Sequence, residues 1–171
     1  MKKTLTVLIL ALFMLVSAGF VFGAETAKEG SDTASTGFTF TSQVLAQGEE
    51  YLQMNYDAQG VVATENEASP LYMSSVQCVG SLKSIKGVYK EIGLCTYTCP
   101  NGDQIYASYE GTGKIGQGAR GLTTFVGGTE KCVGITGGGE WTRINLKGPA
   151  KGVGASILKF IYNWKIPPDK Q

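Results

Sequence analysis

The chain has 171 residues, which include 24 glycines, 4 cysteines and no histidine. A chain of this length forms a single domain of ordinary size. The absence of histidine excludes Ser-His-Asp and Cys-His catalysis as well as imidazole ligands for a metal. Fifteen basic against 14 acidic residues give no electrostatic basis for binding nucleic acid.

The first 23 residues have the pattern of a cleavable export signal. Lys2 and Lys3 supply the positive start, residues 5–22 are mostly apolar, and Val21-Phe22-Gly23 ends in a cleavage pattern before Ala24. The competing interpretation is a membrane anchor, which the small residues at the end of the apolar run and the polar stretch after it disfavour. We therefore predict a periplasmic or secreted protein that retains no membrane segment after cleavage.

The remainder of the chain alternates as β-strands do. Residues 24–36 are small and polar without periodicity, which predicts a flexible leader before one folded domain over residues 37–171. Alternation is clearest near the C-terminus, where one face carries Leu158, Phe160, Tyr162, Trp164 and Ile166. Turns are predicted at Lys86-Gly87 and at Pro100–Asp103. Many short strands without an amphipathic helix predict an antiparallel barrel or sandwich.

A glycine motif in the middle of the chain looks like a nucleotide-binding loop. Gly111–Gly116 matches the pattern G-x-G-x-x-G. A dinucleotide site needs a helix directly after this pattern, to present its N-terminus to the pyrophosphate. Here the alternating segment Leu122–Val126 follows instead, so we interpret the motif as a turn between strands.

The four cysteines suit an exported protein, in which we expect two disulfides. Cys78 and Cys95 are centred on the Lys86-Gly87 turn and would face each other across a hairpin. Cys99–Cys132 follows by elimination, and a meander from Cys95 onward brings these two residues to the same rim. A Cys₄ zinc site is the alternative, although it needs reduced thiolates and tighter paired spacings. We expect no metal and no cofactor.

Aromatic residues are numerous, and in a closed barrel they either fill the core or line a ligand pocket. Charged residues at predicted strand ends, such as Glu110 and Arg143, would lie at the rim, whereas Glu91 follows Lys90 and is expected to be solvated. No side chain is identified as catalytic. The candidate ligand-binding residues are Tyr97, Tyr109, Glu110, Trp141, Arg143, Tyr162 and Trp164.

One segment resembles a family signature. Residues 125–139, FVGGTEKCVGITGGG, are similar to the pattern F-x-G-G-T-G-K-F-x-G-I-x-G-x-G of uncharacterised bacterial proteins with allene-oxide-cyclase-like, calycin-type barrels. Cys78-Val-Gly80 and the segment Cys95–Asp103 also look like parts of that family. Two positions depart from the pattern, since Glu130 replaces a glycine and Cys132 replaces an aromatic residue.

The resemblance implies an eight-stranded antiparallel barrel, and it leaves three functions open. The first is binding of a small apolar ligand in the interior, supported if a cavity above about 300 Å³ is present. The second is an isomerase or cyclase of the allene-oxide-cyclase type, which needs a buried carboxylate. The third is a filled barrel that acts as an envelope structural or interaction module. Dirigent proteins share this barrel, and a homo-oligomer is compatible with all three functions.

Overall fold

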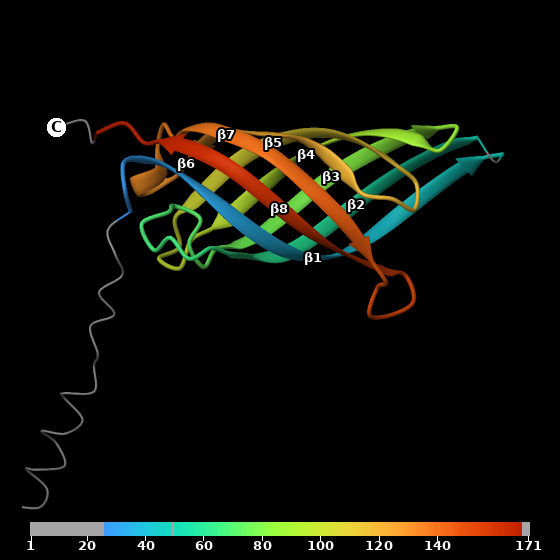
Figure 1. Ribbon diagram of the computed structural model, residues 1–171, viewed down its shortest axis with the longest axis horizontal. Coiled ribbons are helices and arrows are strands. Elements are labelled where there is room, and N and C mark those ends of the chain that lie inside the picture. Colours follow the sequence, from blue (N-terminus) through green and yellow to red (C-terminus); the bar gives the residue numbers. More distant parts are fainter. Residues whose placement is uncertain (1–25, 49, 169–171) are drawn as a thin grey trace, which may run out of the picture.

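The protein is an eight-stranded antiparallel barrel in a computed structural model that describes residues 26–48 and 50–168 (Figure 1). The expected signal lies outside the described residues. The strands are β1 (Glu29–Gln47), β2 (Tyr51–Ala63), β3 (Ser75–Ile85), β4 (Val88–Thr98), β5 (Gln104–Lys114), β6 (Ala119–Gly128), β7 (Thr136–Leu146) and β8 (Val153–Lys165), with the 3₁₀ helix η1 (Glu130–Cys132) between β6 and β7. Within this part of the chain, no helix has the length and apolarity to cross a membrane.

Each strand pairs with the next along the chain, and β8 pairs with β1 to close the barrel. This order confirms the predicted all-β meander. The short connections β1–β2, β3–β4, β5–β6 and β7–β8 lie at one end, which we call the open end. The β2–β3 connection, the β4–β5 turn and η1 lie at the other, the plugged end (Figure 1).

The first strand corrects the predicted leader, because β1 begins at Glu29 and not after Thr36. Residues 29–36 pair with the last part of β8. Ala34 and Thr36 are buried, since small side chains fit where the inner wall is crowded by aromatic rings from β8. Asp32 accepts hydrogen bonds from Thr64 and Tyr162. A segment without large apolar residues therefore forms a strand through pairing and small-residue packing.

Two predicted turns are present. Lys86 and Gly87 both have positive φ, 52° and 77°, as a two-residue hairpin requires. In the β4–β5 connection the amide of Gly102 bonds the carbonyl of Cys99, so Pro100 and Asn101 occupy the centre of the turn and only Gly102 has positive φ. The G-x-G-x-x-G motif forms the end of β5 and the start of the β5–β6 turn, and strand β6 follows it.

One of the two predicted disulfides is present. Cys78 and Cys95 are register partners on β3 and β4 and form a disulfide, as expected. The predicted Cys99–Cys132 disulfide is wrong in this structure, where both residues are free thiols. They do meet at one rim, where the interaction between the two thiols lowers the pKa of Cys99 and raises the pKa of Cys132. The thiol of Cys99 donates a hydrogen bond to the carbonyl of Pro70, 3.2 Å away, and forms no disulfide with Cys132.

The plugged end is filled with side chains. Phe160 and Tyr162 stack at 4.6 Å between ring centroids, and Phe125 packs edge-on against both. The Tyr162 hydroxyl contacts Ser69 in the β2–β3 connection, and the Trp164 indole donates to the carbonyl of Ala27. Both residues, predicted as ligand-binding, instead close one end of the barrel.

Glycines on the inner wall receive aromatic rings from neighbouring strands. A Cβ at Gly121 would lie 2.4 Å from the Trp141 ring and 2.0 Å from the backbone oxygen of Glu110. A Cβ at Gly93 would lie 2.3 Å from the Tyr109 hydroxyl. The rings therefore lie along the wall, in space that any other residue would occupy.

This arrangement makes Gly121 intolerant of alanine. We expect Gly121→Ala to destabilise the protein by about 2 kcal/mol, because the new methyl group overlaps backbone atoms that cannot move aside. The measurement is urea unfolding followed by tryptophan fluorescence.

Gly37→Ala is the matched control, since a Cβ at Gly37 meets nothing within 4 Å. That variant should be neutral or stabilised by up to about 0.5 kcal/mol. Equal stability of the two variants would show that ring packing on Gly121 does not constrain the wall.

Candidate functional site

A cavity of about 170 Å³ occupies the barrel interior. One side of the cavity is apolar and comes from β1, β2 and β8, with Phe38, Phe40, Met54 and Leu158 among its lining residues. Ile115, Gly116 and Asn145 also line it, and they belong to the β5–β6 turn and the last part of β7, which places the mouth at the open end. The cavity is smaller than the 300 Å³ that typical ligand pockets exceed, so the volume that would support interior binding of an ordinary ligand is not reached.

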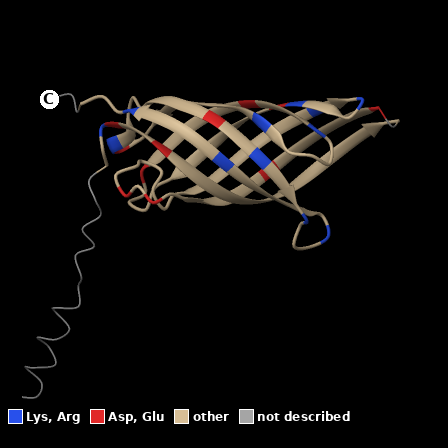
Figure 2. Cartoon of the chain, in the orientation of Figure 1, with Lys and Arg blue, Asp and Glu red and all other residues tan. Residues whose placement is uncertain are grey.

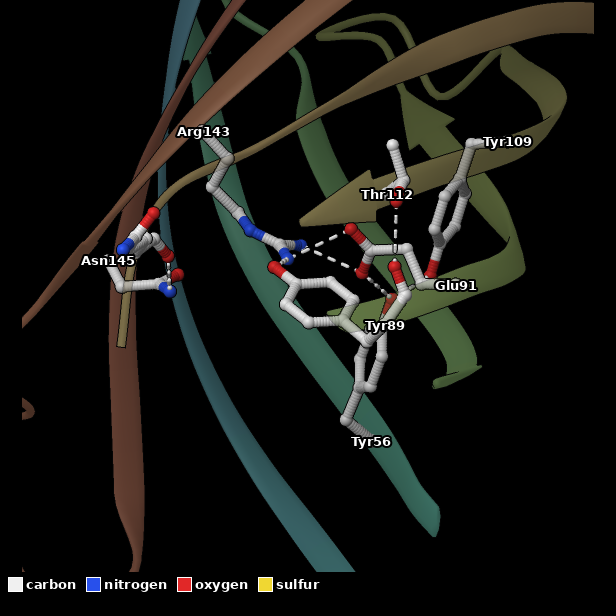
Figure 3. A network of polar contacts seen from close by, with 8 residues as sticks. Tyr56, Tyr89, Glu91, Tyr109, Thr112, Arg143 and Asn145 are labelled. Carbon is white, nitrogen blue, oxygen red and sulfur yellow. Dashed lines mark hydrogen bonds and ion pairs between the residues drawn. The ribbon is translucent and has the colours of Figure 1, made fainter. Parts of the chain in front are cut away.

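A buried ion pair stands on the other side of the cavity. Glu91 on β4 faces inward, and its side chain has no exposed surface. Arg143 on β7 binds it with both terminal nitrogens, at 2.9 and 3.1 Å (Figure 3). This bidentate geometry is the strong form of an arginine–carboxylate contact. The prediction that Glu91 is solvated is therefore wrong.

Three tyrosines complete the cluster around this pair. The Tyr89 hydroxyl accepts a hydrogen bond from Arg143 at 3.1 Å, and the Tyr56 hydroxyl donates to Glu91 at 3.0 Å. Tyr56 and Tyr109 are joined at 2.6 Å. Because the single Tyr56 proton goes to Glu91, Tyr109 must be the donor in that contact. A directed chain of hydrogen bonds thus runs from Tyr109 through Tyr56 to Glu91 (Figure 3).

Burial shifts the ionisation of this cluster. It raises the pKa of Tyr109 to about 12, although the hydrogen bond with Tyr56 opposes the shift. The pKa of Tyr56 is raised further, by burial first and then by the charge of Glu91. Burial alone would lower the pKa of Arg143, but Glu91 and Tyr89 hold it above its ordinary value. At neutral pH Tyr56 and Tyr109 are therefore neutral and Arg143 is charged.

Some polar groups in the cavity wall have no partner. The hydroxyls of Tyr97, Thr123 and Ser156 line the cavity and make no side-chain hydrogen bond with the described residues. Within the same part of the chain, Nε of Arg143 and Nε1 of Trp141 are buried donors without an acceptor. The Arg143 guanidinium lies 5.6 Å from the centre of the Trp141 ring. This cation–π contact partly compensates for the missing acceptor of Nε.

The structure brings four of the seven predicted site residues to the cavity: Tyr97, Tyr109, Trp141 and Arg143. Glu110 points to solvent on the outer face of β5, and Tyr162 and Trp164 belong to the plugged end. Tyr56, Tyr89 and Glu91 also line the cavity and were not predicted as site residues.

A signal for Glu91 exists in the sequence. Tyr89, Glu91, Gly93, Cys95 and Tyr97 share one face of β4, so alternation from the disulfide places the carboxylate inside. The opposite face carries Ile92 and Leu94, which are 62 % and 65 % exposed. Because both faces of β4 carry large apolar or aromatic residues, the alternation alone does not indicate which face lies inside the barrel.

Comparison with known proteins identifies the fold alone. The structure of a pterocarpan synthase dirigent protein is similar, with a TM-score of 0.52 over 86 % of this chain and 91 % of that chain at 13 % sequence identity. No family model and no curated protein matches the sequence. The likeness supports the eight-stranded barrel that the signature implies.

The ion pair should be essential to the fold as well as to the site. We expect Glu91→Gln to cost about 3 kcal/mol, since it leaves the Arg143 charge buried without its counterion. Chemical denaturation of the purified variants measures this cost.

Two further variants control this experiment. Glu67→Gln changes an exposed carboxylate in the β2–β3 connection and should stay within about 0.5 kcal/mol of the native protein. The double variant Glu91→Gln with Arg143→Gln should lose less than the sum of its single changes. Strict additivity would contradict a coupled pair.

Proposed function

We propose that the barrel binds a small, uncharged, largely apolar molecule in its interior. The observation that carries the proposal is the ion pair. Among the residues that the structure describes, Glu91 and Arg143 are the only charged ones in the cavity lining, and they neutralise each other. A charged ligand would find no counterion there and would have to give up its hydration. An uncharged ligand meets aromatic and aliphatic surface together with a few polar groups.

The free hydroxyls define the polar part of this ligand. Tyr97, Thr123 and Ser156 can each donate or accept a hydrogen bond. A molecule with one hydroxyl or carbonyl group would satisfy one or more of them. The volume sets the size, since an apolar cavity of about 150 Å³ accommodates benzene. We infer a ligand of about one ring.

The setting of this activity is also a proposal. We propose that the protein works in the periplasm or outside the cell, on the basis of its signal-like N-terminus and its disulfide between Cys78 and Cys95. The allene-oxide-cyclase-like signature and the dirigent protein of similar fold are consistent with an interior site in such a barrel.

Calorimetric titration with phenol and with benzene tests the binding site. We expect both to bind, with phenol favoured about fivefold by one hydrogen bond. Tyr97→Phe should reduce the preference for phenol and leave benzene binding unchanged. Leu158→Trp should abolish both by filling the cavity. Absence of binding up to the solubility limit, or binding unaffected by Leu158→Trp, would contradict the proposal.

A second function, proton-transfer isomerisation, is favoured by the chain from Tyr109 to Glu91. A ligand proton can pass to the Tyr109 oxygen while the Tyr109 proton moves to Tyr56 and the Tyr56 proton to Glu91. Reversal of the chain onto another ligand atom completes an isomerisation and restores every group. Tyrosine and glutamate are established acid–base groups in such steps.

The probe for this activity is 3-cyclohexen-1-one, a one-ring uncharged ketone. In D₂O we expect conversion to the conjugated ketone with deuterium incorporated, followed by absorbance and mass spectrometry. Tyr109→Phe should slow conversion about 100-fold, whereas Tyr106→Phe, on the outer face of the same strand, should not. A ketone that binds but is not converted would leave the binding function and eliminate the isomerase.

A further inference from the structure

Outside the barrel, the register aligns ten exposed residues in two rows across five strands. The rows lie on β4, β5, β6, β7 and β8 and line a groove of about 700 Å³ in the outer wall. We call these residues the outer belt. Its first row is Lys90, Thr112, Arg120, Thr142 and Lys159. Its second row is Ile92, Glu110, Leu122, Glu140 and Ile161.

Charge alternates regularly within the outer belt. The first row has a cation on every second strand with threonine between, and the second row has glutamates on the two strands that carry threonine in the first. Figure 2 shows basic and acidic positions interspersed on the barrel wall. No charged side chain of the belt forms an ion pair or hydrogen bond with another described residue.

The belt also exposes apolar surface. Ile92, Leu122 and Ile161 are 62 %, 50 % and 56 % exposed, and each neighbours a cation of the first row along its own strand. A partner that covered these side chains would remove their apolar surface from water.

We propose that the outer belt is the surface through which two copies of this chain associate. The two-fold axis is parallel to the two rows and lies midway between them. The first row of one copy therefore faces the second row of the other. Arg120 at the centre of the belt then lies over Leu122 of the partner copy, on which its methylene stem can pack. Its charged head reaches a glutamate on the next strand, about 4.8 Å to the side.

This orientation pairs the charges at the centre of the belt, because Arg120 falls between Glu110 and Glu140 of the other copy. The five strands are more than half of the closed eight-stranded ring, so the wall curves away and Lys90 on β4 and Lys159 on β8 lie at the margins of the contact. The other face-to-face orientation, with the axis along the strands, sets Arg120 against Arg120 and Glu110 against Glu140. Like charges in contact are disfavoured by several kcal/mol. Charge complementarity thus selects one arrangement.

The size of the belt predicts a weak dimer. Five strands spaced about 4.8 Å apart span about 19 Å, so the contact is smaller than the roughly 800 Å² per partner of a standard interface. Exposed charge pairs are screened by salt. We therefore expect association that is measurable at low ionic strength and weakened at least tenfold in high salt.

Charge reversal with complementation tests the proposal. Sedimentation velocity at low salt should show a dimer of the native protein. Arg120→Glu alone, and the pair Glu110→Lys with Glu140→Lys alone, should each be monomeric. Mixed together, the two variants should form a heterodimer, detected by native mass spectrometry with one partner isotopically labelled. Lys151→Glu and Glu67→Lys, which lie in exposed connections away from the belt, should leave the native dimer intact.

Each alternative result has a definite meaning. A native protein that is monomeric at low salt and high concentration overturns the proposal. A dimer that persists in Arg120→Glu overturns the role of the belt. Monomeric variants that do not combine overturn the proposed axis. Circular dichroism and thermal unfolding of each variant distinguish loss of association from loss of fold.

Discussion

Aromatic rings lying on inward-facing glycines are the contact on which the rest of this barrel depends. Because Gly80 and Gly93 have no side chain, Tyr109 can lie across β4 and β3 and bring its hydroxyl to Tyr56. Trp141 uses Gly111 and Gly121 in the same way. Rings that lie flat against the wall leave the centre of the open half empty. The inward-facing glycines under Tyr109 and Trp141 and the cavity therefore have one physical cause.

The ion pair fits this arrangement, because removing two charges from water requires a fixed partner for each. Glu91 obtains three hydrogen bonds, two from Arg143 on β7 and one from Tyr56 on β2. The wall of rings excludes water from the carboxylate. Because the two charges neutralise each other, the cavity presents a neutral surface. Under the proposed binding function, selectivity would come from shape and from the few hydroxyls left free.

The features that depend on local pattern could be predicted from the sequence. The meander, the Lys86-Gly87 turn and the Cys78–Cys95 disulfide all follow from alternation and symmetry along the chain. Position along the barrel axis has no such signal, so Tyr162 and Trp164 could not be assigned to the plugged end. The first half of β1 was missed because pairing with β8, a contact between distant parts of the chain, is what makes those polar residues a strand.

The residues on the inner face of the wall are related to those on its outer face. Inward glycines leave fewer apolar side chains to bury, while strands still favour aliphatic residues that fit a pleated surface. Those residues appear on the outside instead, as Ile92, Leu122 and Ile161. On β5, Glu110 and Thr112 point outward and belong to the outer belt. Gly111, which lies between them, faces inward against the Trp141 ring. The same alternation that hollows the interior thus places exposed aliphatic and charged residues in register outside, where a second copy can cover them.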